Sequence, residues 1–299
     1  TSGGLTVLQT LAMLEHKDLG QYANDPVRRY NLVLQALQLA FADRNKYLGD
    51  PEFVDIPFDG WLDPDYIEAR AARMSPDLVD CTKITAGTVP GATSAAQGPS
   101  EAAFDGETTH LTVVDRWGNV VAFTTTIEQV FGTGRMLPGY GFMINNELTD
   151  FDARPGGPNE VQPFKRPLSS IAPSIVFDDG APILTLGSPG GPRIIGSVVQ
   201  VLINIFDLGL DLQTAVALPR LFSSSCTASP NVRWDAGFPD AIRAALSAQP
   251  FNYRFEPAPQ EVGNVNLIAI GGEAYTGVAD PRREGVAIGL TDKAGKQGK

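Results

Sequence analysis

The chain has 299 residues, a formal net charge of −11 and a sequence pI of about 4.7. Apolar residues make up 43% of it, so a sizeable buried core is expected and wholesale disorder is excluded. Lys and Arg are not clustered in the way that phosphate binding requires, which argues against a nucleic-acid-binding protein and favours one that handles small molecules.

Helical patterns dominate the first part of the chain. A helical period covers residues 5–14, and a second helix is predicted over 27–47, with Asp25-Pro26 as its start signal. Gly49-Asp50-Pro51 ends that helix, and a short helix is predicted from residue 63 to about 74.

Residues 82–107 change in character. They are rich in Gly, Ala, Ser, Thr and Pro and carry few large apolar side chains, which predicts a linker or a mobile loop. A structureless loop of this length in a compact domain usually has a function.

From His110 onwards the pattern is rich in strands. Residues 110–115 and 120–127 alternate and are β-branched, with a tight turn at 117–119. Strands in hairpins with helices grouped beside them predict an α+β layered domain, and no internal repeat is present. Further strands are predicted at 141–145, 174–177, 182–186, 231–235, 252–256, 264–271 and 273–278, and helices at 190–208, 211–218 and 239–248.

Cysteine and histidine are scarce. Cys81 and Cys226 are the only cysteines, and their spacing matches neither a metal site nor a disulfide framework. Cys226 is predicted to lie in a surface loop. The two histidines, His16 and His110, are too few for a histidine-based metal site, and no metal or organic cofactor is expected. His110 and Asp115 are assigned structural roles.

The ends and the apolar runs give little about location. The most apolar long run, 194–210, contains Gln200, Asn204 and Asp207 and predicts an amphipathic or buried helix instead of a membrane span. Thr1 is preceded by no initiator Met and begins no signal-peptide pattern, so the chain is expected to begin in mid-protein.

Several motifs, in order, resemble the γ-glutamyltranspeptidase family. "TTHLTVVDRWGNVV", "FGTG", "GFMINNELTDF", "KRPLSSIAPSIV", "GSPGGPRII" and "ADPR" look like that family's small subunit. Upstream, "TSGGLTVLQTLAMLE" and "FADRNKYLGDPEFVDIP" look like the end of its large subunit. The resemblance covers essentially the whole chain, and the ordered set is far more specific than any one motif.

The resemblance implies a fold and a way of maturing. The fold would be the αββα four-layer sandwich of N-terminal-nucleophile hydrolases. Residues 1–107 would be the C-terminal part of the large subunit and 108–299 the whole small subunit, together one domain. The precursor would cut itself between Glu107 and Thr108. The missing first part of the large subunit would be a partner and would supply an arginine for the substrate's α-carboxylate. Family analogy places the protein in the periplasm or outside the cell, and the compartment stays open.

Thr108 is the predicted nucleophile. From the residues alone, Thr108-Thr109 is either ordinary strand-edge threonine or a point where the chain cuts itself. A hydroxyl needs a neighbouring base, and an α-amino group that titrates near about 7.7–8.0 can be that base. A cut before Thr108 would put nucleophile and base on one residue, so no histidine is needed.

Three further residues are given catalytic roles by the resemblance. The Thr126 hydroxyl would bond to the nucleophile's oxygen. Gly190 and Gly191, at a predicted helix start, would form the oxyanion hole through their backbone N–H groups. Taken alone, Thr126 is strand filler and a Pro-Gly-Gly sequence is usually only a turn.

The substrate pocket is predicted from two polar pairs. Ser169 and Ser170 would hold the donor's α-carboxylate, and Glu147 and Asp150 would hold its α-ammonium group. By themselves these are a loop pair and an acidic pair of a kind that is usually solvated or capping. Glu128 departs from the family pattern, because many members have Asn there; it is predicted to line the same pocket and puts the donor in doubt.

The function expected is a γ-glutamyl hydrolase or transpeptidase. It would take glutathione-like γ-glutamyl amides and pass the acyl group to water, an amino acid or a peptide. Alternatives are relatives with another substrate (a cephalosporin or glutaryl acylase, a polyglutamate depolymerase or a hydrolase of secondary metabolism) and an inactive, truncated homologue. The sequence leaves open the donor, the acceptor and the balance of hydrolysis against transfer.

Overall fold

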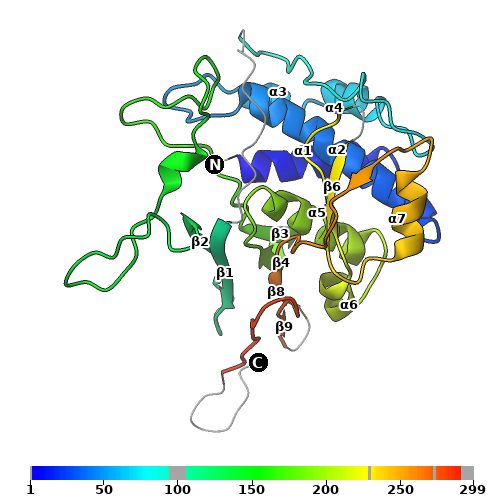
Figure 1. The fold of residues 1–299 in the computed structure, drawn as a ribbon. Helices are drawn as coiled ribbons and strands as arrows, with labels where there is room; N and C mark the ends of the chain where they lie inside the picture. Colours follow the sequence, from blue (N-terminus) through cyan, green and yellow to red (C-terminus); the bar gives the residue numbers. More distant parts are fainter. Residues whose placement is uncertain (1, 94–105, 228–229, 272–273, 291–299) are drawn as a thin grey trace.

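The computed structural model describes residues 2–93, 106–227, 230–271 and 274–290 (Figure 1). Its helices are α1 (Gly3–Glu15), α2 (Pro26–Tyr47), α3 (Phe58–Trp61), α4 (Pro64–Ala71), α5 (Arg193–Phe206), α6 (Leu212–Ala217) and α7 (Asp240–Ser247), with 3₁₀ turns η1 (Leu19–Tyr22) and η2 (Glu147–Asp150). Its strands are β1 (Gly106–Val114), β2 (Val120–Gln129), β3 (Ser174–Asp178), β4 (Ala181–Gly187), β5 (Leu221–Phe222), β6 (Asn231–Trp234), β7 (Arg254–Phe255), β8 (Asn266–Ala269) and β9 (Thr276–Val278).

The predicted helices are confirmed, with shifts at their ends. Asp25 caps α2 by accepting from the N–H of Arg28 at 3.2 Å, and Asp63 caps α4 in the same way. The helix α5 begins three residues later than predicted. Gly190 and Gly191 precede it with φ of +130° and +56°, outside the right-handed helical region.

The strands form three sheets. One is the antiparallel hairpin β1-β2, one has the order β3-β4-β8-β9, and one has the order β5-β6-β7. The predicted turn at 117–119 is confirmed, with Gly118 at φ +83°.

One predicted strand is wrong. Residues 141–145 form no strand and make only an isolated bridge from Met143 to Met136. Their apolar side chains have no sheet to pack on, and Phe142 is 54% exposed. Apolar alternation favours a strand only where a neighbouring strand is available, and here the segment lies in a long loop between β2 and η2.

The reading of the cysteines is also wrong, because Cys81 and Cys226 form a disulfide. They are 145 residues apart in sequence. Val79, two residues before Cys81, packs against the same core cluster as Cys226. Spacing along the chain contains no trace of this juxtaposition, since only the tertiary fold creates it.

The described part of the predicted linker is irregular but docked. Residues 82–93 bury Ile84 and Val89, and the N–H of Gly87 donates to Asp43 Oδ1 at 2.6 Å. The prediction of a loose segment is therefore wrong for these residues, which two isolated apolar side chains anchor. Residues 94–105 lie outside the described ranges.

The molecule is layered, with helices on one face of the β3-β4-β8-β9 sheet and the β1-β2 hairpin on the other (Figure 1). Leu184 and Leu186 of β4 pack into the core that α1, α2 and α5 line. On the opposite face, Thr185 Oγ1 lies 2.8 Å from Thr112 Oγ1 of β1. Gly187 lies so close to the His110 ring that a Cβ there would be 2.3 Å from it.

The outer face of the hairpin is apolar and exposed. Side chains alternate along β1 and β2, and the outward set consists of Leu111, Val113, Val121 and Phe123, each 46–51% exposed. The fold is α+β, and its described residues supply a helix layer and two sheet layers. The fourth layer of the αββα sandwich would cover this exposed face.

Candidate active site

The two predicted threonines face each other across the hairpin. The antiparallel register of β1 and β2 pairs Thr108 with Thr126. Thr108 is buried, and its hydroxyl donates to Thr126 Oγ1 at 2.9 Å. The N–H of Glu128 donates to the same oxygen, also at 2.9 Å. The hairpin therefore brings the predicted nucleophile and its predicted partner into direct contact.

The hairpin is irregular beside Thr108. Gly106 pairs with Gln129 and Thr108 with Thr126, so β2 has one residue more than β1 between these pairs. Glu128 lies in this bulge with φ +72°, a left-handed conformation that costs a non-glycine residue about 1 kcal/mol or more. The bulge lies opposite the peptide that joins Glu107 to Thr108, which is the predicted cleavage site.

A cavity of about 680 Å³ opens beside the paired threonines. It brings together residues from the hairpin, η2, the loop before β3 and the turn before α5. Of the predicted site residues, those that line it are Thr108, Thr126, Glu128, Asp150, Ser169, Ser170 and Gly191. Gly190 and Glu147 do not line it, although their chain neighbours Gly191 and Leu148 do.

One side of the cavity is acidic. Glu128 is only 6% exposed, and among the described residues no hydrogen-bond partner reaches its Oε2. Burial, followed by the neighbouring Glu147 and Glu128 carboxylates, raises the pKa of Asp150 to about 7. Burial also raises the pKa of Glu147. The acidic side of the cavity is therefore suited to bind a positively charged group.

The other side holds the two serines and a cation that the sequence reasoning missed. Arg44 of α2 is 7% exposed, and its Nη2 donates to Ser170 Oγ at 2.9 Å. Its Nε donates to Ser2 Oγ, which in turn donates to the carbonyl oxygen of Ser169 at 2.8 Å. The only signal for Arg44 in the sequence was its place in the "FADR" motif, which assigned it no role.

The glycine turn comes immediately before α5 and does not form its first turn, contrary to the prediction. The carbonyl groups of Gly190 and Gly191 accept from the N–H groups of Arg193 and Ile194. The N–H groups of Gly190 and Gly191 belong to the turn that leads into α5, and backbone N–H groups at the approach to a helix N-terminus can bind negative charge. Behind the turn, a Cβ on Gly190 would lie 3.2 Å from Gly263 Cα.

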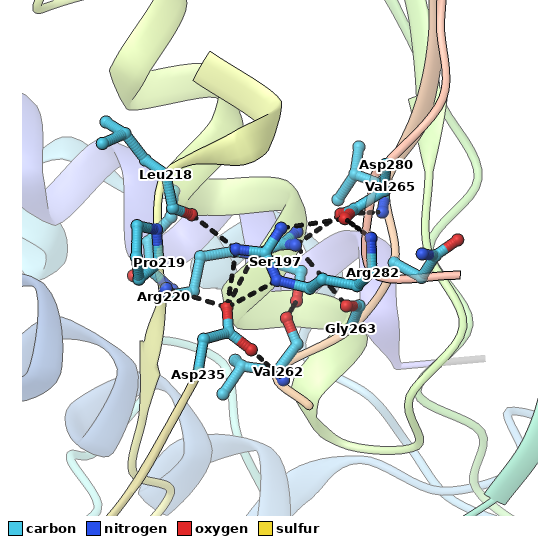
Figure 2. A network of polar contacts seen from close by, with 12 residues as sticks. Ser197, Leu218, Pro219, Arg220, Asp235, Val262, Gly263, Val265, Asp280 and Arg282 are labelled. Atoms are coloured by element: carbon cyan, nitrogen blue, oxygen red, sulfur yellow. Dashed lines mark hydrogen bonds and ion pairs between the residues drawn. The ribbon is translucent and has the colours of Figure 1, made fainter. Parts of the chain in front are cut away.

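A network of buried ions fixes the segment that contains Gly263 (Figure 2). Arg220 contacts the carboxylates of Asp235 and Asp280, and Arg282 contacts both as well. Asp235 accepts from the N–H of Val262 at 2.6 Å. The network thus holds the segment against which the glycine turn packs.

His110 and Asp115 have the structural roles predicted for them. His110 is buried with its Nδ1 2.8 Å from Thr124 Oγ1, and it does not line the cavity. Burial lowers the pKa of His110 to about 4. Asp115 accepts from the N–H groups of Trp117 and Asn119 and so stabilises the turn.

Neither a metal centre nor a membrane-spanning helix is present in the described ranges. No group of three or more His, Cys, Asp or Glu side chains there is placed to hold a metal ion. Within the same ranges, every helix is too short or too polar to cross a bilayer.

Comparison with known proteins gives one family. Residues 1–290 match the family model described as gamma-glutamyltranspeptidase. The chain is 45% identical to the glutathione hydrolase proenzyme of Bacillus subtilis, over 98% of this chain and 50% of that protein. It is 32% identical to the acylase ACY 1 proenzyme of a Pseudomonas strain, over 100% of this chain and 50% of that protein. The chain spans about half the length of the curated relatives it matches.

Among solved structures, a highly active mutant of the gamma-glutamyltranspeptidase from Pseudomonas nitroreducens is similar at 35% identity and a TM-score of 0.56. The match covers 62% of this chain and 100% of that one. A cephalosporin acylase from Bacillus halodurans is similar at 25% identity and a TM-score of 0.72, over 92% of this chain and 48% of that one.

Proposed function

The chain belongs to the gamma-glutamyltranspeptidase family, and we propose that it is the nucleophile-bearing part of a self-processing γ-glutamyl hydrolase or transpeptidase. The observation that carries this proposal is the contact between the Thr108 and Thr126 hydroxyls at the edge of a cavity with an acidic side and a serine–arginine side. Residues 1–107 are then the end of the large subunit and 108–299 the small subunit.

Maturation would proceed in two steps. The Thr108 hydroxyl attacks the carbonyl carbon of Glu107, the C–N bond breaks, and an ester joins Glu107 to Thr108 Oγ1. Water then hydrolyses the ester to give a carboxylate on Glu107 and a free α-amino group on Thr108. The bulge at Glu128, opposite this peptide, supports the proposal, because an irregular ladder leaves the peptide less constrained than a regular strand would.

Turnover would use the same oxygen. The α-amino group of Thr108 takes the hydroxyl proton, and Oγ1 attacks the γ-carbonyl of the donor. The N–H groups of Gly190 and Gly191 stabilise the oxyanion, and the donor's amine leaves with a proton. Water, an amino acid or a peptide then attacks the acyl-threonine and restores the free hydroxyl.

The two sides of the cavity suit a γ-glutamyl head. Its α-ammonium group would bind on the side of Glu128 and Asp150, with Glu147 nearby, and its α-carboxylate would bind Ser169 and Ser170. Glutathione-like γ-glutamyl amides are therefore the proposed donors.

The acylases among the relatives favour a second candidate, a glutaryl or cephalosporin acylase. A glutaryl group has no α-ammonium group that could bind the acidic side of the cavity. That mismatch favours the γ-glutamyl proposal over this one.

The proposed partner is the part of the large subunit that the matched relatives have beyond this chain. It would cover the exposed apolar face of the hairpin and add an arginine to the donor pocket. Burial of four large apolar side chains on one sheet face is the kind of contact that joins layers of a single domain.

Intact mass of the full-length parent protein tests the proposal, followed by assays with two anilides. We expect one species that ends at Glu107, one that begins at Thr108, and faster release of p-nitroaniline from the γ-glutamyl than from the glutaryl anilide. The Thr108→Ala variant should stay uncut and inactive. Normal cleavage of that variant would refute the placement of the nucleophile, and preference for the glutaryl anilide would favour the acylase.

A further inference from the structure

We propose that Arg44 is a positioning residue for the donor's α-carboxylate, acting through Ser170 and Ser169. This inference rests on the proposed function and deepens it. It starts from the chemistry of the guanidinium group, which can donate hydrogen bonds but cannot accept them.

The contact with Ser170 decides how that hydroxyl is used. Since Arg44 Nη2 donates to Ser170 Oγ at 2.9 Å, the serine oxygen accepts there. A hydroxyl has one proton, and Ser170 is left to donate it elsewhere. Ser170 lines the cavity, so the bond from Arg44 turns it into a donor suited to a carboxylate.

A second contact fixes the backbone beside it. Arg44 Nε donates to Ser2 Oγ at 2.8 Å, and the Ser2 hydroxyl donates a hydrogen bond to the carbonyl oxygen of Ser169. The backbone N–H of Ser2 also donates to that carbonyl, at 2.9 Å. The start of α1 and the serine pair are thereby held together through one arginine.

The N-terminus of α1 packs directly against the backbone that follows Ser169, with no room for a side chain at Gly3. A Cβ on Gly3 would lie 2.3 Å from the carbonyl oxygen of Ile171 and 2.7 Å from that of Ser170. Only glycine allows the helix to come so close. Arg44 is thus a buried cation in a tight junction that faces the carboxylate end of the proposed donor.

The test uses the full-length parent protein and two anilides that differ only in the α-carboxylate. These are the γ-glutamyl and the 4-aminobutanoyl p-nitroanilides. We expect Arg44→Met to lower kcat/KM for the γ-glutamyl anilide roughly 10- to 100-fold, mainly through KM. The reason is that Ser170 would no longer be held to donate its hydrogen bond to the charged α-carboxylate. The second anilide should lose no more than about threefold, since it has no group for Ser170 to bind.

Two variants act as controls for this test. Arg28→Met removes an arginine from the exposed side of the same helix and should change neither anilide's KM. In a Ser170→Ala background, Arg44→Met should cost less than in the unmodified protein, because the part of its effect that passes through Ser170 is already lost.

Equal losses for both anilides would overturn the proposal, because they would indicate only structural damage. If Arg44→Met fails to fold, Arg44→Lys replaces it. One ammonium group cannot reproduce the bonds to both Ser2 and Ser170. If Arg44→Lys kept the full preference for the γ-glutamyl over the 4-aminobutanoyl anilide, that would also overturn the proposal. Absence of γ-glutamyl turnover in the unmodified protein would instead refute the proposed function.

A different observation carries a second inference. We infer that the disulfide between Cys81 and Cys226 keeps the two products of self-cleavage covalently joined. Cys81 precedes the proposed cut at Glu107 and Cys226 follows it, so the bond would cross from one subunit to the other. The described ranges contain no free cysteine that could exchange with it.

Formation of the Cys81–Cys226 disulfide requires an oxidant, and a disulfide of another molecule can be that oxidant. Two cysteine thiols lose two electrons and two protons to a partner disulfide, which leaves as a dithiol. The link then makes association of the subunits intramolecular, with an effective concentration in about the millimolar range for short tethers. Dilution therefore should not separate the two subunits of the mature protein.

Denaturing gels with and without reductant test the link on the full-length protein. We expect one band without reductant and two bands with it, while the Cys81→Ser/Cys226→Ser variant should give two bands in both. Two bands for the unmodified protein without reductant would overturn the inference. One band in every lane, with a single intact mass, would mean that no cleavage took place and would refute the proposed function instead.

Discussion

The N–H of Glu128 donates to Thr126 Oγ1, the same oxygen that accepts from the Thr108 hydroxyl. Glu128 lies in the β2 bulge and adopts the left-handed φ of +72°. An unfavourable backbone conformation beside a reactive group often marks a functional site. Here the hydrogen bond from the Glu128 N–H fixes Thr126 Oγ1, the oxygen towards which the Thr108 hydroxyl points.

Replacing Thr126 by Val should slow both cleavage and turnover. The substitution keeps the β-branched shape but removes the acceptor for Thr108 and leaves the N–H of Glu128 without this partner. Loss of a buried hydrogen-bond partner costs about 1–3 kcal/mol, so we expect kcat to fall roughly 10- to 100-fold. Time courses of cleavage and anilide release measure both effects.

Thr125→Val is the matched control, because Thr125 lies on the same strand with its side chain on the exposed face. It should cleave and turn over like the unmodified protein. Equal losses in the two variants would mean that the strand, and not the Thr126 hydroxyl, is responsible.

Glu128→Gln should move the acid limb of kcat/KM to lower pH. The Asp150 carboxylate is proposed to bind the donor's ammonium group, so kcat/KM should rise as pH passes the Asp150 pKa of about 7. Burial is the main cause of that raised pKa, but the Glu128 charge adds to it. Removing a negative charge nearby favours ionisation of Asp150 at lower pH.

A pH series of kcat/KM with the γ-glutamyl anilide measures the position of this limb. An unmoved limb in Glu128→Gln would assign it to another group, such as the α-amino group of Thr108, which has an ordinary pKa of about 7.7–8.0. The substitution retains the backbone and the side-chain length, so the bulge should persist.

Local signals predicted much of the fold. The capped helices α2 and α4 begin where Asp-Pro pairs placed them, since a cap acts within one turn of the chain. The β1-β2 hairpin followed from alternation and a glycine turn. The segment 141–145 has the same alternation but no neighbouring strand, so its prediction as a strand was wrong.

Contacts between distant segments could not be predicted in this way. Arg44 and Ser170 are 126 residues apart, and neither carries a local mark of the other. The disulfide between Cys81 and Cys226 has the same origin. The family resemblance supplied most of the candidate site, but it assigned roles only to residues already known to have one, and Arg44 was not among them.

His110 should make stability fall in mild acid. Its pKa is about 4 in the folded protein because of burial, against an ordinary value of 6.5. Between these values the unfolded chain binds a proton that the folded chain does not, so the folded state loses stability as pH falls from 6.5 towards 4. From pH 7 to pH 5 the loss in the free energy of unfolding should be about 2 kcal/mol.

Urea unfolding at the two pH values, compared with His110→Gln, isolates this effect from that of Asp150. The variant should lose about 2 kcal/mol less than the unmodified protein over the same step. His16→Gln, which alters an exposed histidine, should behave like the unmodified protein. Identical pH dependence in all three proteins would contradict the burial argument.

Asp280→Ala should be strongly destabilising. Asp280 and Arg220 are both almost fully buried and in contact, and Arg282 shares the carboxylate (Figure 2). Removing one partner leaves the Arg220 charge in the interior with less compensation, which typically costs about 3–5 kcal/mol. The network also holds Gly263 against the glycine turn, so kcat should fall together with stability.

Asp77→Ala is the matched control, because Asp77 pairs with Arg28 at the surface with both side chains about half exposed or more. Surface pairs of this kind contribute about 0–1 kcal/mol. Urea midpoints of the two variants should therefore differ widely, and only Asp280→Ala should lose activity. If both variants unfold at the same urea concentration, the buried network adds no more to stability than a surface pair does.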